Sequence, residues 1–284
     1  MLIVLLAVVI APAVFLGRLW KTTVDRNKLA VAAEPFRIAG NFYYIGTNDT
    51  SVFLITGPAG HVVLDGGESA TAPLIIASIA KLGFDIKDVK ALINSDAHGA
   101  GALSALKQAS GAQVWASDAS ARVMAAGGDD PDMSLPPRVL VKIGILAYPP
   151  VRVDHLLKDG ETIRVGPIAL TAHITGGVSR GCTSWSFPVR DGDRVLHVVS
   201  VCSLTVAEGM RYPEQGADLE RSFRVLRNLP ADIWVTGRSR TWGRYRKFVA
   251  SADAKNPSGA FIDPAGYRAY IDDAETGYHL GVVH

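Results

Sequence analysis

The sequence predicts an α/β fold, a four-layer αββα sandwich in which two β-sheets lie inside and helices cover both outer faces. Hydrophobic residues make up 48% of the 284-residue chain and charged residues 20%, which is typical of a globular protein with a sizeable core. Short apolar segments typical of strands alternate with segments of helical periodicity. These segments form two halves, and each half runs from strands to helices.

The first half begins with β structure between residues 36 and 64. Its strand-like segments are rich in aromatic and β-branched residues and lie at 42–45, 52–56 and 61–64. An amphipathic helix follows, with Ser69 or Thr71 as its cap and Gly83 at its end.

The stretch N-S-D-A-H-G-A-G-A-L at 94–103 follows an apolar strand at 89–93 and precedes a helix at 104–109. Asp96 and His98 therefore lie on a loop at the carboxyl end of a strand, where open α/β sheets usually place their sites. A strand at 113–116 and a helix at 118–124 complete this half.

The second half starts after a stretch rich in Gly, Asp and Pro at 127–150, which we interpret as a long loop or lid. Short β segments occupy 155–201, with Asp-Gly hairpin turns at 159–160 and 191–192. The remaining elements are a helix at 218–228, a strand at 233–235 and a helix at 264–276.

Charge and cysteine content exclude several classes of protein. The 29 basic and 27 acidic residues give a formal charge of +2, so nothing favours nucleic-acid binding. With only Cys182 and Cys202, the chain can build neither a disulfide framework nor a thiolate zinc site.

The N-terminus carries an apolar run at 1–17, followed by basic residues. We interpret residues 1–33 as a signal peptide or N-terminal membrane anchor, and 34–284 as the folded domain. The tripeptide Ala30-Val31-Ala32 resembles a cleavage site and favours an exported or periplasmic protein. An inner-membrane anchor through residues 1–17 and a buried N-terminal helix are the alternatives.

Six ordered segments between residues 35 and 275 resemble the metallo-β-lactamase superfamily, and specifically its third subclass of exported zinc enzymes. They are P-F-R-I-A-G-N at 35–41, V-L-D-G-G at 63–67, the helix region 103–111, G-C-T-S-W at 181–185, C-S-L-T at 202–205 and F-I-D-P-A-G-Y at 261–267. The resemblance implies the αββα sandwich, with a site at the edge between the two sheets.

The family's zinc ligands come from an H-x-H-x-D-H loop, a histidine before G-C-T-S-W and a histidine after a late strand. The zinc acidifies a water that attacks an amide carbonyl. Here Asp96 replaces the first histidine, His98 remains, and the shortened loop lacks the aspartate and the third histidine. Val178 and Arg238 stand at the two later positions. A catalytic site needs about three protein ligands, so we expect no zinc cofactor, or weak binding at His98 with Asp96 as a substitute.

The resemblance also assigns roles outside the ligand set. Ser203 and Thr205 match positions near the substrate carboxylate, although they would equally cap a strand end. Cys182 and Cys202 match a cysteine pair of some members, which implies a disulfide. Asp65 matches a residue that ties the loop together.

The other histidines are expected in supporting, packing or surface roles rather than as ligands. His173 aligns with a family histidine that is not a usual ligand. We expect His197 in the core and the C-terminal histidines in a mobile end. The remaining histidines are His61, His155, His279 and His284.

Our functional hypothesis is a degenerate, monomeric, non-hydrolytic homologue that binds a small anionic ligand in a dismantled zinc site. Asp96 and His98 are the candidate catalytic residues, and Arg180 and Arg238 the gained cations, because arginine forks bind carboxylate or phosphate. A solvated basic loop that includes Arg240, Arg244 and Arg246 is the alternative. The other functions left open are a zinc hydrolase of β-lactams or related cyclic amides or esters with a weak site, metal-free hydrolysis, and a structural role.

Overall fold

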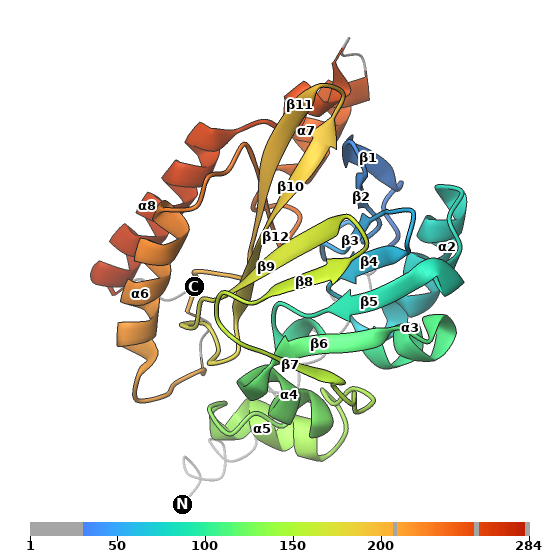
Figure 1. Cartoon of the computed structure of the whole chain (residues 1–284). Coiled ribbons are helices and arrows are strands. Elements are labelled where there is room, and N and C mark those ends of the chain that lie inside the picture. Colours follow the sequence, from blue (N-terminus) through green and yellow to red (C-terminus); the bar gives the residue numbers. More distant parts are fainter. Residues whose placement is uncertain (1–30, 207–208, 253–255, 282–284) are drawn as a thin grey trace, which may run out of the picture.

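The computed structural model describes residues 31–206, 209–252 and 256–281. Two β-sheets face each other at the centre of the molecule (Figure 1). Helices α6 (Gln215–Arg227) and α8 (Pro264–His279) cover one side, and α2 (Ala72–Lys81) and α3 (Leu103–Ser110) cover the other (Figure 1). The four-layer αββα sandwich expected from the sequence is confirmed.

The first sheet has seven strands in chain order, from β1 at one edge to β7 at the other. The strands β1 to β4 are antiparallel because short turns join them, whereas helical crossovers make β4 to β7 parallel. The strands are β1 (Phe36–Ala39), β2 (Phe42–Tyr44), β3 (Phe53–Ile55), β4 (His61–Leu64), β5 (Val89–Ile93), β6 (Gln113–Ser117) and β7 (His155–Leu157).

The second sheet has five strands in the order β12-β11-β10-β9-β8. Strand β12 lies parallel to β11 because α6 crosses between them. The strands are β8 (Thr162–Val165), β9 (Ile168–Ile174), β10 (Thr183–Asp191), β11 (Arg194–Val201) and β12 (Ile233–Thr236).

Strand β4 illustrates how the sequence builds two cores at once. Its four residues are all buried. Since successive side chains of a strand point to opposite faces, Val62 and Leu64 join the core between the sheets, and Val63 joins the core beneath α2. The uninterrupted apolar run is therefore what a strand covered on both faces requires.

Several sequence expectations are wrong in detail. Residues 127–150 are not one loop, because α5 (Leu135–Lys142) lies within them, and helix α7 (Arg244–Ala252) was not predicted. Helix α5 has two prolines in its first turn, where proline is tolerated, but in the sequence they look like loop residues. The C-terminal helix α8 extends to His279, which contacts Glu220 at 2.8 Å instead of lying in a mobile end.

The expected membrane segment at 1–17 lies outside the described residues, as does most of the predicted signal peptide or anchor at 1–33. Among the helices that the structure describes, none is long and apolar enough to cross a bilayer.

Candidate functional site

A cavity of about 460 Å³ opens where strands of both sheets end. Its two main walls are the loops that follow β4 and β5 in the first sheet and β11 and β12 in the second, and the loops after β2 and β9 add Thr50, Ser51 and Val178. Of the six residues predicted to be catalytic or substrate-binding, five line this cavity: Asp96, His98, Ser203, Thr205 and Arg238. Arg180 does not.

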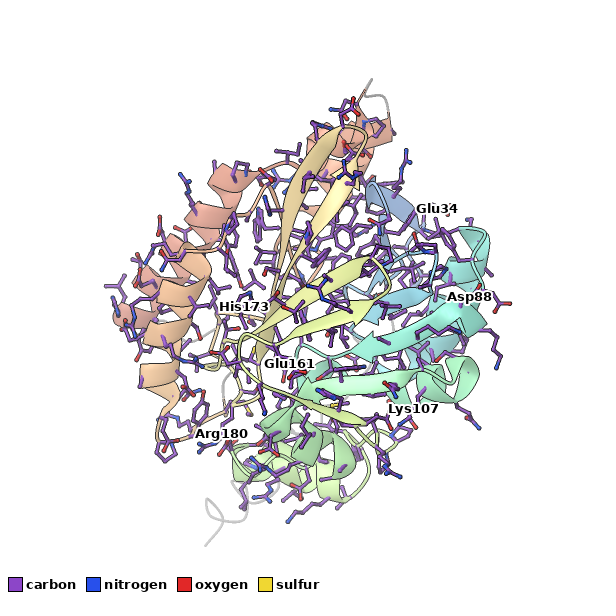
Figure 2. The ribbon with its side chains drawn as sticks, viewed as in Figure 1. Glu34, Asp88, Lys107, Glu161, His173 and Arg180 are labelled. Carbon is purple, nitrogen blue, oxygen red and sulfur yellow. A yellow bond between two sulfur atoms is a disulfide. The ribbon has the colours of Figure 1, made fainter. Side chains whose placement is uncertain are left out.

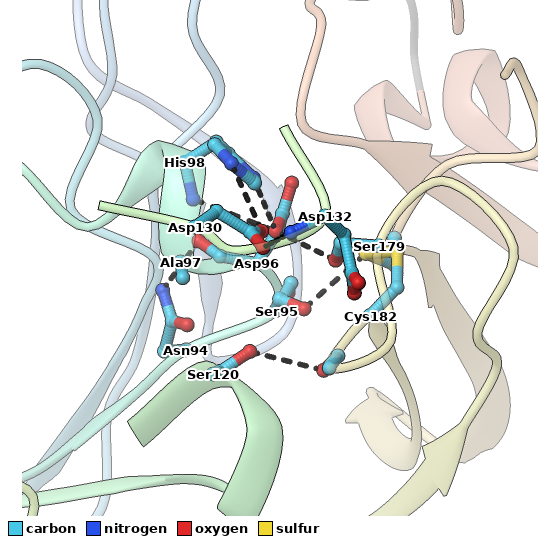
Figure 3. Close-up of polar contacts among 12 residues, drawn as sticks. Asn94, Ser95, Asp96, Ala97, His98, Ser120, Asp130, Asp132, Ser179 and Cys182 are labelled. Atoms are coloured by element: carbon cyan, nitrogen blue, oxygen red, sulfur yellow. Dashed lines mark hydrogen bonds and ion pairs between the residues drawn. A yellow bond between two sulfur atoms is a disulfide. The ribbon is translucent and has the colours of Figure 1, made fainter. Parts of the chain in front are cut away.

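Asp96 is fixed by contacts from three directions. It caps the short 3₁₀ turn Ala97–Gly99, and the Asn94 amide donates to its carbonyl oxygen at 3.0 Å. The Ser179 hydroxyl donates to the carboxylate Oδ1 at 3.0 Å, and His98 Nδ1 lies 3.2 Å from the same oxygen (Figure 3). Burial alone would raise the pKa of Asp96, but the charge of His98 and these hydrogen bonds bring it below its ordinary value.

His98 lies between two carboxylates. Its Nδ1 faces Asp96, and its Nε2 lies 3.4 Å from Oδ2 of Asp130 (Figure 3). Burial alone would lower the pKa of His98, yet Asp96 and then Asp130 raise it to about 9. Both carboxylates therefore favour the protonated form of the imidazole.

Asp130 was missed by the sequence analysis. It lies in the segment G-G-D-D-P-D at 127–132, is 4% exposed, and accepts a hydrogen bond from the amide of Asp132 at 2.9 Å. Burial raises its pKa, against the effect of that bond and of His98. The run of aspartates was visible in the sequence, but nothing there indicated that its second member reaches His98.

Asp65 links the two strand ends of the first wall. Its carboxylate accepts from the Ser95 amide at 2.7 Å and from the Ser95 hydroxyl at 3.0 Å. Its backbone has φ +70°, which is uncommon for a residue other than glycine. Burial raises its pKa to about 7 despite both bonds. These contacts agree with the loop-tying role that the resemblance implied.

Three arginines lie together in the second wall, and two of them share one carboxylate. Arg238 and Arg240 both pair with the buried Asp49, the latter at 2.7 Å. Arg244 is 6% exposed, donates to the Asn48 side chain at 3.1 Å and lies over the Tyr44 ring. This cluster therefore keeps a positive charge. The Arg238 side chain is 56% exposed and lines the cavity.

Arg180 lies on the loop between β9 and β10 and is engaged elsewhere (Figure 2). Its guanidinium pairs with Asp132 and Glu214, both at 2.6 Å, and stacks on Tyr212. It lines a neighbouring cavity of about 360 Å³ that also contains Ser120 and Asp130. The structure therefore separates the two arginines that the sequence analysis grouped together.

The predicted disulfide between Cys182 and Cys202 is present. It joins the loop after β9 to the end of β11 and packs against Val178 on the cavity wall. The disulfide therefore keeps Val178, which stands at a family histidine position, close to Cys202 and the Ser203 that follows it.

The other histidines that the structure describes lie away from the cavity. His173 contacts the Ser186 hydroxyl at 2.8 Å within the second sheet (Figure 2), and His155 contacts Glu161 at 2.6 Å. His197 is exposed and not in the core, because its neighbours Leu196 and Val198 occupy the inward positions of β11. Over the described part of the chain, no three His, Cys, Asp or Glu side chains form a metal-binding group.

Comparisons with known proteins agree with this architecture. A family model described as "Metallo-beta-lactamase superfamily" matches residues 45–238, which is more than half of the chain. Rm3 metallo-beta-lactamase is similar at 37% identity and a TM-score of 0.81, covering 89% of this chain and 94% of its own.

Two further solved structures are similar over most of their length. BJP-1, a subclass B3 metallo-beta-lactamase of Bradyrhizobium japonicum, has 30% identity and a TM-score of 0.80, with 90% of this chain and 96% of that one covered. A Cronobacter sakazakii metallo-beta-lactamase described by a HARLDQ motif has 33% identity and a TM-score of 0.81, with 90% and 91% covered. This chain therefore belongs to the metallo-beta-lactamase superfamily.

Proposed function

We propose that this protein binds a small anionic ligand in the cavity between its two sheets and does so without a catalytic zinc ion or hydrolysis. The observation that carries the proposal is the position of His98, whose two ring nitrogens face Asp96 and Asp130. A histidine binds zinc through a lone pair of its neutral ring. An imidazolium held by two carboxylates offers none.

The remaining matched positions support the same conclusion. Val178 presents an apolar side chain, and Arg238 presents a cation that is paired with Asp49. The oxygen of Asp96 that faces His98 also accepts from Ser179. The donor set therefore does not fit a zinc ion, which needs about three protein ligands.

An anionic ligand fits the second wall of the cavity. Arg238 and Arg240 both pair with Asp49, so its single negative charge offsets only one of their two positive charges. The side chains of Ser203, Thr205 and Thr241 add hydroxyl groups to the same cavity. Guanidinium groups with nearby hydroxyls bind carboxylate or phosphate through charge-assisted hydrogen bonds.

We also infer an oxidising compartment. Disulfides persist in exported proteins and are rare in proteins of reducing compartments. The Cys182–Cys202 bond together with the β-lactamase relatives therefore supports export. A periplasmic location is the form that we propose.

Two arginine variants test the anionic ligand. Titration calorimetry with inorganic phosphate and with succinate should detect binding to the wild type. Arg238→Ala should weaken it about tenfold or more, because a charge-assisted contact is lost. Arg180→Ala is the matched control and should leave it unchanged. Equal loss in both variants, or no binding by the wild type, would contradict the proposal.

Zinc content tests the other half of the proposal. The purified protein, dialysed against micromolar zinc, should retain no stoichiometric metal and should not hydrolyse nitrocefin. Stoichiometric zinc accompanied by nitrocefin turnover would instead establish the alternative, a hydrolase of β-lactams or related cyclic amides or esters with an atypical metal site.

A further inference from the structure

The cavity between the two sheets has an excess of negative charge along its first wall. Glu68 and Asp96 line the cavity there, and Asp130 is the further carboxylate that contacts His98 (Figure 3). Even when His98 is protonated, three carboxylates stand against one positive charge. Asp65, whose pKa is raised to about 7, adds part of a further negative charge at neutral pH. This wall therefore favours a cationic group.

The second wall of the same cavity has the opposite charge. Arg238, Arg240 and Arg244 lie together there, and Asp49 offsets one of their three positive charges. The cavity is therefore negative on one side and positive on the other. Such a charge distribution is complementary to a ligand that carries both signs of charge.

Glu68 is the exception among the carboxylates of the first wall. Asp65 and Asp96 accept hydrogen bonds from neighbouring residues. Glu68 is half-buried and precedes the 3₁₀ turn Ser69–Thr71 without capping it. Within the described part of the chain, no hydrogen bond or ion pair engages its carboxylate, which lines the cavity. Glu68 can therefore bind a ligand without giving up a partner.

The shortened loop at 99–102 leaves the charge of Glu68 unopposed. Its sequence is Gly-Ala-Gly-Ala, so it carries no side chain larger than a methyl group, and the family's aspartate and third histidine are absent. The two backbones lie close together, because Gly67 pairs with Ala100 and a Cβ on Gly101 would stand 3.0 Å from the carbonyl carbon of Glu68. Small residues at this contact therefore fix the position of Glu68 and do not neutralise it.

Glu68 and Arg238 border the same part of the cavity. Thr50, which also lines it, contacts both segments. Its backbone pairs with Arg238, and its Cγ2 lies 3.3 Å from where a Cβ on Gly67 would stand. No ion pair joins Glu68 to Arg238, whose carboxylate partner is Asp49. One small molecule can therefore contact both charges.

We propose that the ligand of this cavity is a small zwitterion, with an ammonium group at Glu68 and a carboxylate at Arg238. An ammonium group donates three hydrogen bonds, and a guanidinium group binds a carboxylate through charge-assisted ones. A dianion would instead place its second charge against the negative wall. The inference rests on the proposed anionic ligand and names its class, an amino acid whose two charged groups are separated by a short carbon chain.

Titration calorimetry on the full chain tests the proposal with matched acids. It compares butyrate with 4-aminobutyrate, and hexanoate with 6-aminohexanoate. In at least one pair the amino acid should bind the wild type about fivefold more tightly, as expected for one partly solvated ion pair. Glu68→Gln should reduce this gain to less than about twofold. The control variant Glu220→Gln, which changes a carboxylate on α6 that pairs with His279, should keep the full gain.

The outcomes separate this inference from the proposed function. An unchanged melting temperature shows that each variant is folded. Equal affinities within both pairs, while the plain acids and succinate bind, would overturn the zwitterion and leave the anionic site intact. A gain that persists in Glu68→Gln would overturn it as well, since the ammonium group would then bind elsewhere. Binding of none of these acids would overturn both proposals.

Discussion

The two walls of the cavity differ in how their charges are used. In the first wall, which follows β4 and β5, Asp65 and Asp96 accept hydrogen bonds from neighbouring residues, and His98 is held between Asp96 and Asp130. In the second wall, which follows β11 and β12, Arg238 and Arg240 share a single carboxylate and remain more than half exposed.

This difference indicates that the first wall maintains the structure of the loops, whereas the second wall is available to bind a ligand. A carboxylate that already accepts hydrogen bonds inside the protein, as Asp65 and Asp96 do, gains little from a ligand, because the ligand must compete with its present partners. A half-exposed guanidinium with unused N–H donors can bind an anion without giving up its present partner. We therefore expect changes in the first wall to alter stability and metal affinity, and changes in the second to alter ligand affinity.

The largest expected effect comes from converting the first wall into a metal site. In Asp96→His/Val178→His, two new histidines would join His98, and the Ser179–Asp96 contact shows that the two loops are adjacent. Three histidines meet the requirement for zinc, so the variant should retain stoichiometric zinc after dialysis. Metal analysis measures it, with Asp96→Asn/Val178→Ala as control. No gain would mean that these loops cannot converge on an ion.

A smaller effect is expected from the charge of His98. The pKa of His98 is raised to about 9 in the folded state from an ordinary value of 6.5, so the folded state binds the proton more tightly. The resulting stabilisation is complete below pH 6.5 and is lost as pH rises through 9.

The wild type should therefore exceed His98→Gln in unfolding free energy by about 2 kcal/mol below pH 6.5. This difference should shrink as the pH rises through 9. Urea denaturation across this range measures it. His197→Gln, at an exposed position on β11, should show a difference that does not vary in this way. A flat profile for His98→Gln would mean that the ion cluster does not stabilise the protein.

The smallest effect is expected from the hydroxyls of the second wall. Ser203→Ala should lower affinity for the anionic probe by about 1 kcal/mol, or roughly fivefold, since one hydrogen bond from an uncharged donor is lost. Calorimetry and a thermal melt together decide between its two possible roles. A lower melting temperature with unchanged affinity would show that Ser203 caps the strand end, as its contact with the Thr205 amide at 3.3 Å also allows.

The sheets were predictable because most of their strands are uninterrupted apolar segments in the sequence. Val89–Ile93 and Ile233–Thr236 were recognised within one residue at each end. Helices α5 and α7 were not recognised. Helix α5 begins Leu-Pro-Pro, and three of the first four residues of α7 are cationic, which hides its apolar period. Local pattern predicts an element when burial dominates its composition, and fails where most of its surface is exposed.

The site was predictable in its location but not in its contacts. Placing Asp96 and His98 at a strand end followed from the order of segments. The partner Asp130 and the separation of Arg180 from Arg238 depend on how distant loops fold over one another, which a single sequence does not encode locally. His98 and Asp130 are 32 positions apart along the chain. Only the packing of 127–132 against the turn Ala97–Gly99 brings them together.

The order of strands also has a consequence for how the chain folds. Every strand of the seven-stranded sheet comes from residues 36–157, and each pairs with its neighbour in the chain. The five-stranded sheet uses residues 162–236 alone. Because synthesis proceeds from the N-terminus, the first sheet has all its strand partners available before any strand of the second is made. The apolar inner face of the first sheet therefore stays exposed until the second sheet is made and packs against it.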